Sequence, residues 1–250
     1  MPHPLLTAEA VALEYRDRTV LEDIDLTVAA GDRVALVGRN GSGKSTLLRL
    51  LAGELAPTAG RVRPAPDLRL AHLPQVELAG AAGSASVREE LAERIGVGPA
   101  EREMDRLTER LGAGEVEAVA AQAEAVERWV ALGGGDLEAR LGPALESVGI
   151  DPGWAERPLA TLSGGQIARV RLAALRLARL DCVLLDEPTN HLDADALELL
   201  DAALREAGHA VVFASHDRAF LAAHADRVVE LDRAGAAEYR GGWEAYRRER

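Results

Sequence analysis

The fold is decided by two adjoining stretches, Arg33-Val-Ala-Leu-Val37 and Gly38-Arg-Asn-Gly-Ser-Gly-Lys-Ser45. The second matches G-x-x-x-x-G-K-[ST], a loop whose backbone N–H groups cradle phosphates while its lysine reaches the β- and γ-phosphates. Lys44 is the single lysine among the 29 basic residues, and a compact ammonium fits between phosphate oxygens better than a broad guanidinium. Apolar strand, loop and helical leucines follow in the order that this motif requires. The sequence therefore predicts a site for a nucleoside triphosphate.

The loop also assigns roles to individual residues. Backbone N–H groups of residues 40–45 are expected to face the phosphates, aided by the positive end of the following helix. Ser45 is expected to coordinate Mg²⁺, and Thr46 to hydrogen-bond the α-phosphate. The predicted nucleotide-binding residues here are Gly38, Arg39, Asn40, Gly41, Ser42, Gly43, Lys44, Ser45 and Thr46.

The second half of a phosphoryl-transfer site is predicted at Val183-Leu-Leu-Asp-Glu187. An apolar strand ending in a carboxylate matches the Walker B pattern, in which Asp186 holds Mg²⁺ directly or through water. Glu187 follows at the tip of the strand, where it is placed to polarise the attacking water. A lone acid at a strand end is usually a surface residue, but its pairing with Asp186 and a phosphate loop favours catalysis.

Three further pieces lie elsewhere along the chain. Leu162-Ser-Gly-Gly-Gln166 opens a predicted helix, and its glycines leave bare N–H groups that form a second phosphate-binding surface. Gln75 ends a predicted strand, from which its amide could reach Mg²⁺ or its water. His216 follows the apolar strand 210–214, from which an imidazole could reach the γ-phosphate. Each piece alone is weak, whereas the set in this order is specific.

Hydrophobic periodicity outlines the architecture. Strands dominate the first 75 residues, and the last 70 alternate strand and helix, which implies a parallel sheet with helical crossovers. The block from about 76 to 158 is helical and is expected to be an insertion in one α/β domain. Predicted strands are 7–15, 20–28, 33–37, 61–63, 68–73, 182–186, 210–214 and 227–231, with helices at 45–55, 194–206 and 218–224.

Within the helical block, one apolar face is read from the spacing of valines and an alanine. Because the residues recur at alternating intervals of three and four, they are expected to pack inside the protein rather than form a partner groove. Asp136 is predicted to cap the next helix, on which leucines and a valine continue the apolar face. The first face is Val116, Val119, Ala123, Val126 and Val130, and the second is Leu137, Leu141, Leu145 and Val148.

Composition excludes several classes of protein. The formal charge of −12 argues against a broad nucleic-acid-binding face. Cys182 is the only cysteine, so no disulfide framework exists. No apolar run is long enough to cross a bilayer and no signal-peptide pattern begins the chain, so we expect a cytoplasmic protein without direct membrane insertion. The C-terminal Tyr246-Arg-Arg-Glu-Arg250 is expected to be a frayed, solvated helix end.

Together these motifs resemble the ATP-binding cassette (ABC) family over nearly the whole chain. The resemblance implies ATP and Mg²⁺ as cofactors, and an α/β fold: a P-loop NTPase (RecA-like) parallel-sheet core with an N-terminal antiparallel β-subdomain and an inserted helical subdomain. It implies that Tyr15 stacks on adenine and that Gln75 is the Q-loop glutamine. Asp193 corresponds to the D-loop aspartate and His216 to the switch histidine. The signature corresponds to Leu162, Ser163, Gly164, Gly165 and Gln166.

The same resemblance implies that ATP is held between two cassettes arranged head to tail, each site joining one P-loop to the other cassette's signature. One chain would then need a second cassette. We expect an ATP-binding domain over residues 1–243, with a helical subdomain inserted at about 76–178, and the start of a linker helix at 244–250.

A narrower resemblance is to the ABC-F branch, whose members lack membrane domains and in many cases act on ribosomes. It is carried by Glu187-Pro-Thr-Asn-His-Leu-Asp193 and Ser215-His-Asp-Arg-Ala-Phe-Leu221, with support from residues 126–134 and 239–246. Members usually carry two cassettes joined by a long charged linker. Because the chain stops at Arg250, about where that linker would begin, we expect either half of a longer protein or a stand-alone cassette that dimerises.

Three functions follow. The first is an ABC-F-type ATPase that couples closure of two cassettes to the ribosome, in translation or antibiotic resistance. The second is the ATPase subunit of a membrane transporter, docking on permease chains through the region after Gln75. The third is a regulatory protein that closes on ATP and scarcely hydrolyses it, which the presence of both Glu187 and His216 disfavours. Motif detail favours the first over the second.

Overall fold

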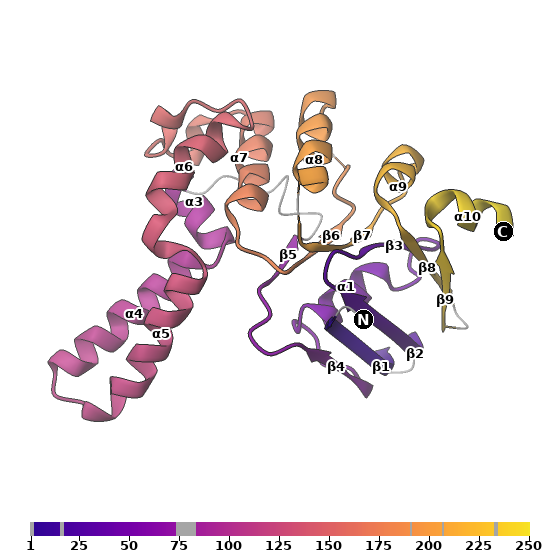
Figure 1. Cartoon of the computed structure of the whole chain (residues 1–250), viewed down its shortest axis with the longest axis horizontal. Helices are drawn as coiled ribbons and strands as arrows, with labels where there is room; N and C mark the ends of the chain where they lie inside the picture. Colours follow the sequence, from indigo (N-terminus) through magenta and orange to yellow (C-terminus); the bar gives the residue numbers. More distant parts are fainter. Residues whose placement is uncertain (1–2, 16–17, 74–83, 191, 207, 233–234) are drawn as a thin grey trace. The chain divides into compact units, whose positions relative to one another are not determined.

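The structure is a computed structural model that describes residues 3–15, 18–73, 84–190, 192–206, 208–232 and 235–250. The chain divides into two compact units, coloured along the sequence in Figure 1. The first unit comprises Met1–Leu78, Leu180–His191 and Leu204–Arg250, and the second comprises Ala79–Arg179 and Leu192–Ala203. The second unit thus takes in a segment beyond the helical insertion expected at about 76–178.

The first unit contains two sheets (Figure 1). The three-stranded sheet is antiparallel, in the order β2-β1-β4, and consists of β1 (Pro4–Tyr15), β2 (Arg18–Ala29) and β4 (Ala59–Pro64). The six-stranded sheet has the order β5-β6-β7-β3-β8-β9 and is parallel from β5 to β8. Its strands are β3 (Arg33–Val37), β5 (Leu70–Leu73), β6 (Cys182–Asp186), β7 (Ala210–Ala214), β8 (Arg227–Asp232) and β9 (Gly235–Arg240).

The predicted parallel core with an antiparallel N-terminal sheet is confirmed. The structure differs from the prediction in one additional strand and in the end of one helix. Strand β9 was not predicted, and it pairs antiparallel with β8 from Arg227↔Arg240 to Asp232↔Gly235. Helix α1 (Lys44–Leu51) ends four residues before the predicted Leu55, because Gly53 takes a φ of +76° that an L-residue rarely adopts.

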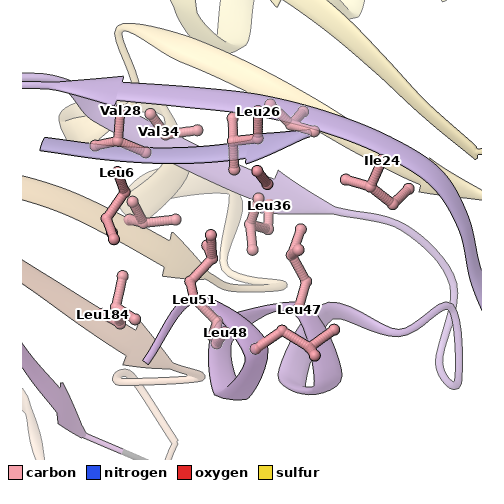
Figure 2. Packing of buried hydrophobic residues seen from close by; sticks show 14 of the residues in the cluster. Leu6, Ile24, Leu26, Val28, Val34, Leu36, Leu47, Leu48, Leu51 and Leu184 are labelled. Atoms are coloured by element: carbon pink, nitrogen blue, oxygen red, sulfur yellow. The ribbon is translucent and has the colours of Figure 1, made fainter. Parts of the chain in front are cut away.

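A single cluster of buried side chains joins α1 to both sheets of the first unit. Leu47, Leu48 and Leu51 of α1 point toward the strands that carry Leu36 and Leu184, as Figure 2 shows. Every residue of β6 and of β7 is buried, as the predicted continuous apolar runs require. Cys182 lies in this core, where burial raises the pKa of its thiol to about 12. The packed core fixes the carboxyl ends of the strands, from which the predicted site residues extend.

The end of the chain is ordered rather than frayed. Helix α10 (Gly242–Glu249) packs an aromatic group against β9, with the rings of Trp243 and Tyr246 stacked at 5.2 Å and Tyr239 edge-on to Tyr246 at 5.1 Å. Arg250 pairs with Glu230 of β8 at 2.7 Å. The frayed end predicted for residues 246–250 is therefore wrong, because α10 continues to Glu249 and contacts on β8 and β9 hold Tyr246 and Arg250, but residues 247–250 are exposed to solvent as predicted.

The second unit is helical within the described residues. Its helices are α3 (Val87–Arg94), α4 (Val97–Gly112), α5 (Val119–Ala131), α6 (Leu137–Glu146) and α7 (Gly164–Leu177), and α8 (Ala194–Glu206) begins in it and ends in the first unit. Short 3-10 turns at Val116–Ala118, Gly134–Asp136, Pro152–Trp154 and Leu159–Thr161 separate them. No helix in the described part of the chain is long and apolar enough to span a membrane.

The valine face of the helical block is exposed, which contradicts the prediction that it packs inside. Val116 is 76% exposed, Val119 55%, Val126 36% and Val130 53%. Helix α5 contacts α4 through another face, where Ala125 is buried beside Leu107. Periodicity therefore identified correctly which residues form the apolar face of α5. It did not identify the face that packs against α4. On α6 the outcome is different, because Leu137, Leu141 and Leu145 are buried as predicted.

Charged side chains fix two further points of the second unit. Asp136 stands at the start of α6 but makes no capping hydrogen bond. Asp136 is the N-cap residue as predicted, but its carboxylate accepts from Arg140 and Arg179 in place of the helix N–H groups. Deeper in the unit, the Glu90 carboxylate accepts from Arg94 at 2.7 Å and from Arg171 at 3.0 Å, which ties α3 to α7.

Candidate functional site

The predicted phosphate loop connects β3 to α1, and two of its glycines are required by space. A Cβ on Gly38, whose φ is +145°, would lie 2.4 Å from the backbone oxygen of Leu231. A Cβ on Gly43, whose φ is +98°, would lie 2.6 Å from Leu21. The loop is therefore pressed between β8 on one side and β2 on the other, which a larger residue at either position would prevent.

Lys44 lies under the loop and is buried. Its ammonium donates to the backbone oxygens of Gly38 at 2.9 Å and Arg39 at 3.3 Å. Burial lowers the pKa of Lys44, while the negative charges of Glu187 and Asp186 partly oppose that shift. The structure thus brings the predicted lysine and both predicted carboxylates into one electrostatic environment.

A pocket of about 880 Å³ adjoins the loop. It is lined by residues 18–20 and Glu22 of β2, residues 39–42 of the loop, residues 231–232 at the end of β8, and Arg250. Tyr15 pairs through its backbone with Arg18, one of these lining residues, although the Tyr15 side chain lies outside the described part of the structure. Ser45 is exposed and Thr46 half-buried at the start of α1.

Asp186 and Glu187 occupy the end of β6 and are both buried. Oxygen Oδ1 of Asp186 is buried and has no hydrogen-bond partner among the described residues. Glu187 adopts a φ of +47°, a conformation uncommon for residues other than glycine, and its N–H donates to Ala214 of β7 at 2.9 Å. Backbone conformations of this kind occur preferentially at functional sites.

His216 lies beside Glu187, just past the end of β7. Its backbone N–H donates to Glu187 Oε2 at 3.2 Å, and its ring nitrogen Nε2 lies 3.1 Å from Oε1. Ser215 is buried, with its hydroxyl 3.4 Å from that of Thr189 and accepting from the N–H of Asp217 at 3.1 Å. This small network holds the turn after β7, and neither Thr189 nor Ser215 was predicted. Their position after a buried strand was the available signal.

The predicted signature residues begin α7 in the second unit. Ser163 caps the helix in a reciprocal capping box: its Oγ accepts from Gln166 N–H at 3.3 Å, and its own N–H donates to Gln166 Oε1 at 2.9 Å. Gly164 and Gly165 are exposed in the first turn, where helix geometry leaves N–H groups unpaired. Leu162 is buried behind them. The result is an exposed cluster of helix N-terminal donors.

Asp193 also belongs to the second unit and lies next to the signature. Its Oδ1 caps α8 by accepting from Ala196 N–H at 2.8 Å. Its Oδ2 lies 3.5 Å from the point where a Cβ on Gly165 would stand. The structure therefore brings the predicted D-loop residue and the predicted signature together. Gln75 lies outside the described residues.

Comparison with known proteins decides the family. The ABC transporter family matches residues 21–190, a span that includes the phosphate loop, the signature and the β6 carboxylates. The chain belongs to this family of ATP-binding cassettes. The resemblance stated from the sequence is thereby confirmed, and so is the fold class.

Curated relatives support the ABC-F resemblance. The cassette is 34% identical to the tylosin resistance ATP-binding protein TlrC of Streptomyces fradiae, over 98% of this chain and 45% of the relative. It is 33% identical to the ATP-binding protein Uup of Haemophilus influenzae, over 94% and 36%. It is 32% identical to the energy-dependent translational throttle protein EttA of Mycobacterium tuberculosis, over 97% and 43%. The chain thus spans less than half the length of these relatives.

Solved structures match the same fold at lower identity. The ATP-binding subunit of an ABC transporter aligns with a TM-score of 0.71 at 23% identity, covering 98% of this chain and 92% of that one. The ATP-binding cassette MJ0796, in a dimeric post-hydrolysis state bound to ADP and phosphate, aligns with a TM-score of 0.64 at 20% identity, covering 94% and 98%. These alignments establish the cassette fold.

Proposed function

We propose that this cassette binds and hydrolyses ATP with Mg²⁺ and closes head to tail on a second cassette, as an ABC-F-type ATPase acting on the ribosome in the cytoplasm. The observation that carries the catalytic part is the grouping in the first unit. Glu187 is buried at the tip of β6 against His216, and Lys44 experiences the charge of both Glu187 and Asp186.

Lys44, Glu187 and His216 have separate roles in the proposed hydrolysis. Lys44 lies under a loop whose N–H groups face the phosphates, so its ammonium would move from backbone oxygens to the β- and γ-phosphates. Glu187 would accept a hydrogen bond from the attacking water and orient it toward the γ-phosphorus. His216 holds the Glu187 carboxylate through its backbone N–H and is expected to contact the γ-phosphate through its ring.

The residues present fit a magnesium ion. Asp186 Oδ1 is buried without a partner in the described part of the chain, which is costly for a carboxylate unless a cation or water meets it. No group of three His, Cys, Asp or Glu that could hold a metal occurs among the described residues, but Mg²⁺ bound with a nucleotide needs only one or two protein ligands beside phosphates and waters. Ser45 and Asp186 would hold the ion, with Gln75 as a further ligand. Bound there, Mg²⁺ would neutralise charge on the phosphates.

The second cassette supplies what one chain cannot. The signature donors of α7 belong to the second unit, and the family arrangement places them on the ATP of the partner. The MJ0796 cassette forms a dimer in its post-hydrolysis state with ADP and phosphate. A second copy of this chain, or a second cassette elsewhere in a longer protein, would complete each site.

The ribosomal role rests on relatives. TlrC is named for tylosin resistance and EttA for a throttle of translation, at 34% and 32% identity. Transporter subunits match at 23% identity or less and support the fold alone. The ABC-F assignment is therefore favoured over the transporter alternative, in which permease chains would be the partners.

The test combines hydrolysis with ribosome binding. Phosphate release should fall by a factor of about 10²–10⁴ in Glu187→Gln, because the water loses its general base, while ATP binding stays. Lys44→Ala should lose binding as well. Glu198→Gln, an exposed acid on α8, is the matched control and should behave as wild type.

Co-sedimentation of Glu187→Gln with bacterial ribosomes, with and without Mg-ATP, tests the partner. ATP-dependent pelleting is expected. Wild-type turnover by Glu187→Gln would overturn the catalytic assignment, and an ATP-dependent dimer that ignores ribosomes would overturn the ribosomal one.

A further inference from the structure

The pocket beside the phosphate loop has one wall that the sequence did not predict. Arg250 follows directly on α10 and lines the same pocket as residues 39–42 of the loop. No nucleotide-binding role was predicted for it, because its nearness to the loop depends on the tertiary path of α10 and not on any local motif. The pocket therefore includes a cation supplied from the end of the chain.

The position of this guanidinium is fixed by two contacts. Its Nε and Nη2 donate to Glu230 Oε1 at 3.2 and 2.7 Å, and Glu230 belongs to β8, whose end also lines the pocket. Helix α10 is in turn held to β9 by Tyr246, whose ring contacts that of Tyr239. Arg250 therefore extends from a packed helix.

The chemistry of the pocket suits an anion. A guanidinium has five N–H donors, and those of Arg250 that are in use bond to Glu230 Oε1 and to the Tyr246 side chain, so donors remain for a phosphate. Arginines line the pocket at positions 18, 39 and 250, against two carboxylates, Glu22 and Asp232. Arginine is suited to phosphate oxygens because its planar fork forms paired hydrogen bonds.

We propose that Arg250 is a further phosphate-contacting residue of the nucleotide site, and that it exchanges Glu230 for the phosphate chain when nucleotide binds. Helix α10 would then respond to nucleotide, because the residue that leaves Glu230 is anchored to it. The inference rests on the proposed ATP binding, since the anion it names is the phosphate chain of ATP.

The proposal predicts that substitutions of the two partners of the ion pair change the affinity for Mg-ATP in opposite directions. Arg250→Gln should weaken Mg-ATP binding about fivefold to tenfold, as loss of a charge-assisted bond to phosphate predicts. Glu230→Gln should tighten it by about twofold to fivefold, because the carboxylate of Glu230 no longer competes with the phosphates for Arg250. Affinity would be measured by titration calorimetry on the full 250-residue chain. Arg248→Gln, also exposed near the end of α10, is the matched control.

A purely structural clasp would behave differently. If Arg250 and Glu230 only hold α10 in place, both substitutions lower affinity and melting temperature together, and the proposal is overturned. Equal affinity of Arg250→Gln, Arg248→Gln and wild type also overturns it. Failure of the wild type to bind Mg-ATP would remove the proposed function and this inference with it, whereas wild-type binding that Lys44→Ala abolishes isolates the outcome to Arg250.

Discussion

The two units differ in how they treat apolar and charged side chains. The first unit buries complete strands: every residue of β6 and β7 is buried, and its buried lysine and carboxylates, Lys44, Asp186 and Glu187, lie at or near the predicted site. The second unit exposes four valines between residues 116 and 130 and buries Arg171 against Glu90 of a neighbouring helix. In the first unit, the buried charged groups coincide with the predicted nucleotide site. In the second, burial positions one helix against another.

A carboxylate that is removed from solvent therefore has a different meaning in each of the two units. A buried carboxylate at the end of a parallel strand, such as Asp186 with its unpartnered Oδ1, has no structural explanation among the described residues and indicates a ligand. A half-buried carboxylate between two arginines, such as Glu90, is satisfied by its neighbours and indicates packing. The presence of protein partners, more than burial, therefore separates Glu90 from Asp186.

The largest expected difference between the units concerns what each contributes to ATP turnover. Ser163→Arg should leave the affinity of a single chain for ATP within about twofold of wild type, because the phosphate loop belongs to the first unit. Turnover should fall by about 100-fold or more, since a bulky cation would block the signature donors from the partner's ATP. Calorimetry and phosphate release measure the two effects.

A matched control exists for that substitution. Ser86 caps α3 with the same reciprocal box, formed with Glu89, in the same unit. Ser86→Arg should cost a similar amount of stability, roughly 1 kcal/mol for a lost cap, and should keep turnover near wild type. Equal loss of turnover in the two variants would mean that cap loss, not the signature, explains the effect.

The second prediction tests the buried ion pairs of the second unit. Glu90→Gln should lower the free energy of unfolding by about 2–3 kcal/mol at pH 7, because two arginines lose charge-assisted hydrogen bonds. Burial raises the pKa of Glu90, but the hydrogen bonds and charges of Arg94 and Arg171 outweigh it and hold the pKa below 4.5. The stabilisation is present above that value and is lost as the pH falls through the depressed pKa.

Urea unfolding at several pH values measures the difference in the free energy of unfolding between wild type and Glu90→Gln. The difference between wild type and Glu90→Gln should be constant near neutrality and narrow once the pH drops below 4.5. Glu103→Gln removes the exposed pair with Arg106 on α4 and should leave the midpoint unchanged at every pH. A pH-independent difference would show that Glu90 acts through shape and not through charge.

The features that could be predicted from the sequence are those with a local signal, and they lie mainly in the first unit. Strands β6 and β7 were predicted to the residue, because their apolar runs are short, continuous and bounded by polar residues. The loop at 38–45 and the carboxylates after β6 are local motifs, so their positions needed no knowledge of tertiary structure. His216 was predicted to reach the γ-phosphate, whereas its contact with Glu187 was not predicted and arises because the parallel strands β6 and β7 end at one edge of the sheet.

The features that were not predicted correctly from the sequence all depend on tertiary packing. Strand β9 has the sequence Gly235-Ala-Ala-Glu-Tyr-Arg240 and is mostly exposed, so its pairing with β8 and not its own pattern makes it a strand. Arg250 reaches the pocket only through the packing of α10. The valine face of α5 was assigned to the interior because periodicity reveals which residues share a face but contains no information on what covers it.

The smallest expected effects come from that valine face, where a buried residue of the same type provides the comparison. Val212→Ala in β7 removes two fully buried methyl groups and should cost about 2–3 kcal/mol, from lost transfer free energy and a residual cavity. Val130→Ala, at a position 53% exposed, should stay within about 0.5 kcal/mol, with alanine's better helix propensity offsetting the lost contacts. Urea midpoints followed by far-ultraviolet circular dichroism compare the pair.

The exposed valine also provides a control on the state of the protein in solution. If Val130→Ala cost more than about 1 kcal/mol, the face would have to be covered, because surface substitutions that touch nothing rarely have such effects. A cover formed by a second copy would make the cost grow with protein concentration, whereas a cost within the chain would not. Equal midpoints at all concentrations would establish that the spacing of the valines, regular as it is, contributes nothing to the stability of this chain.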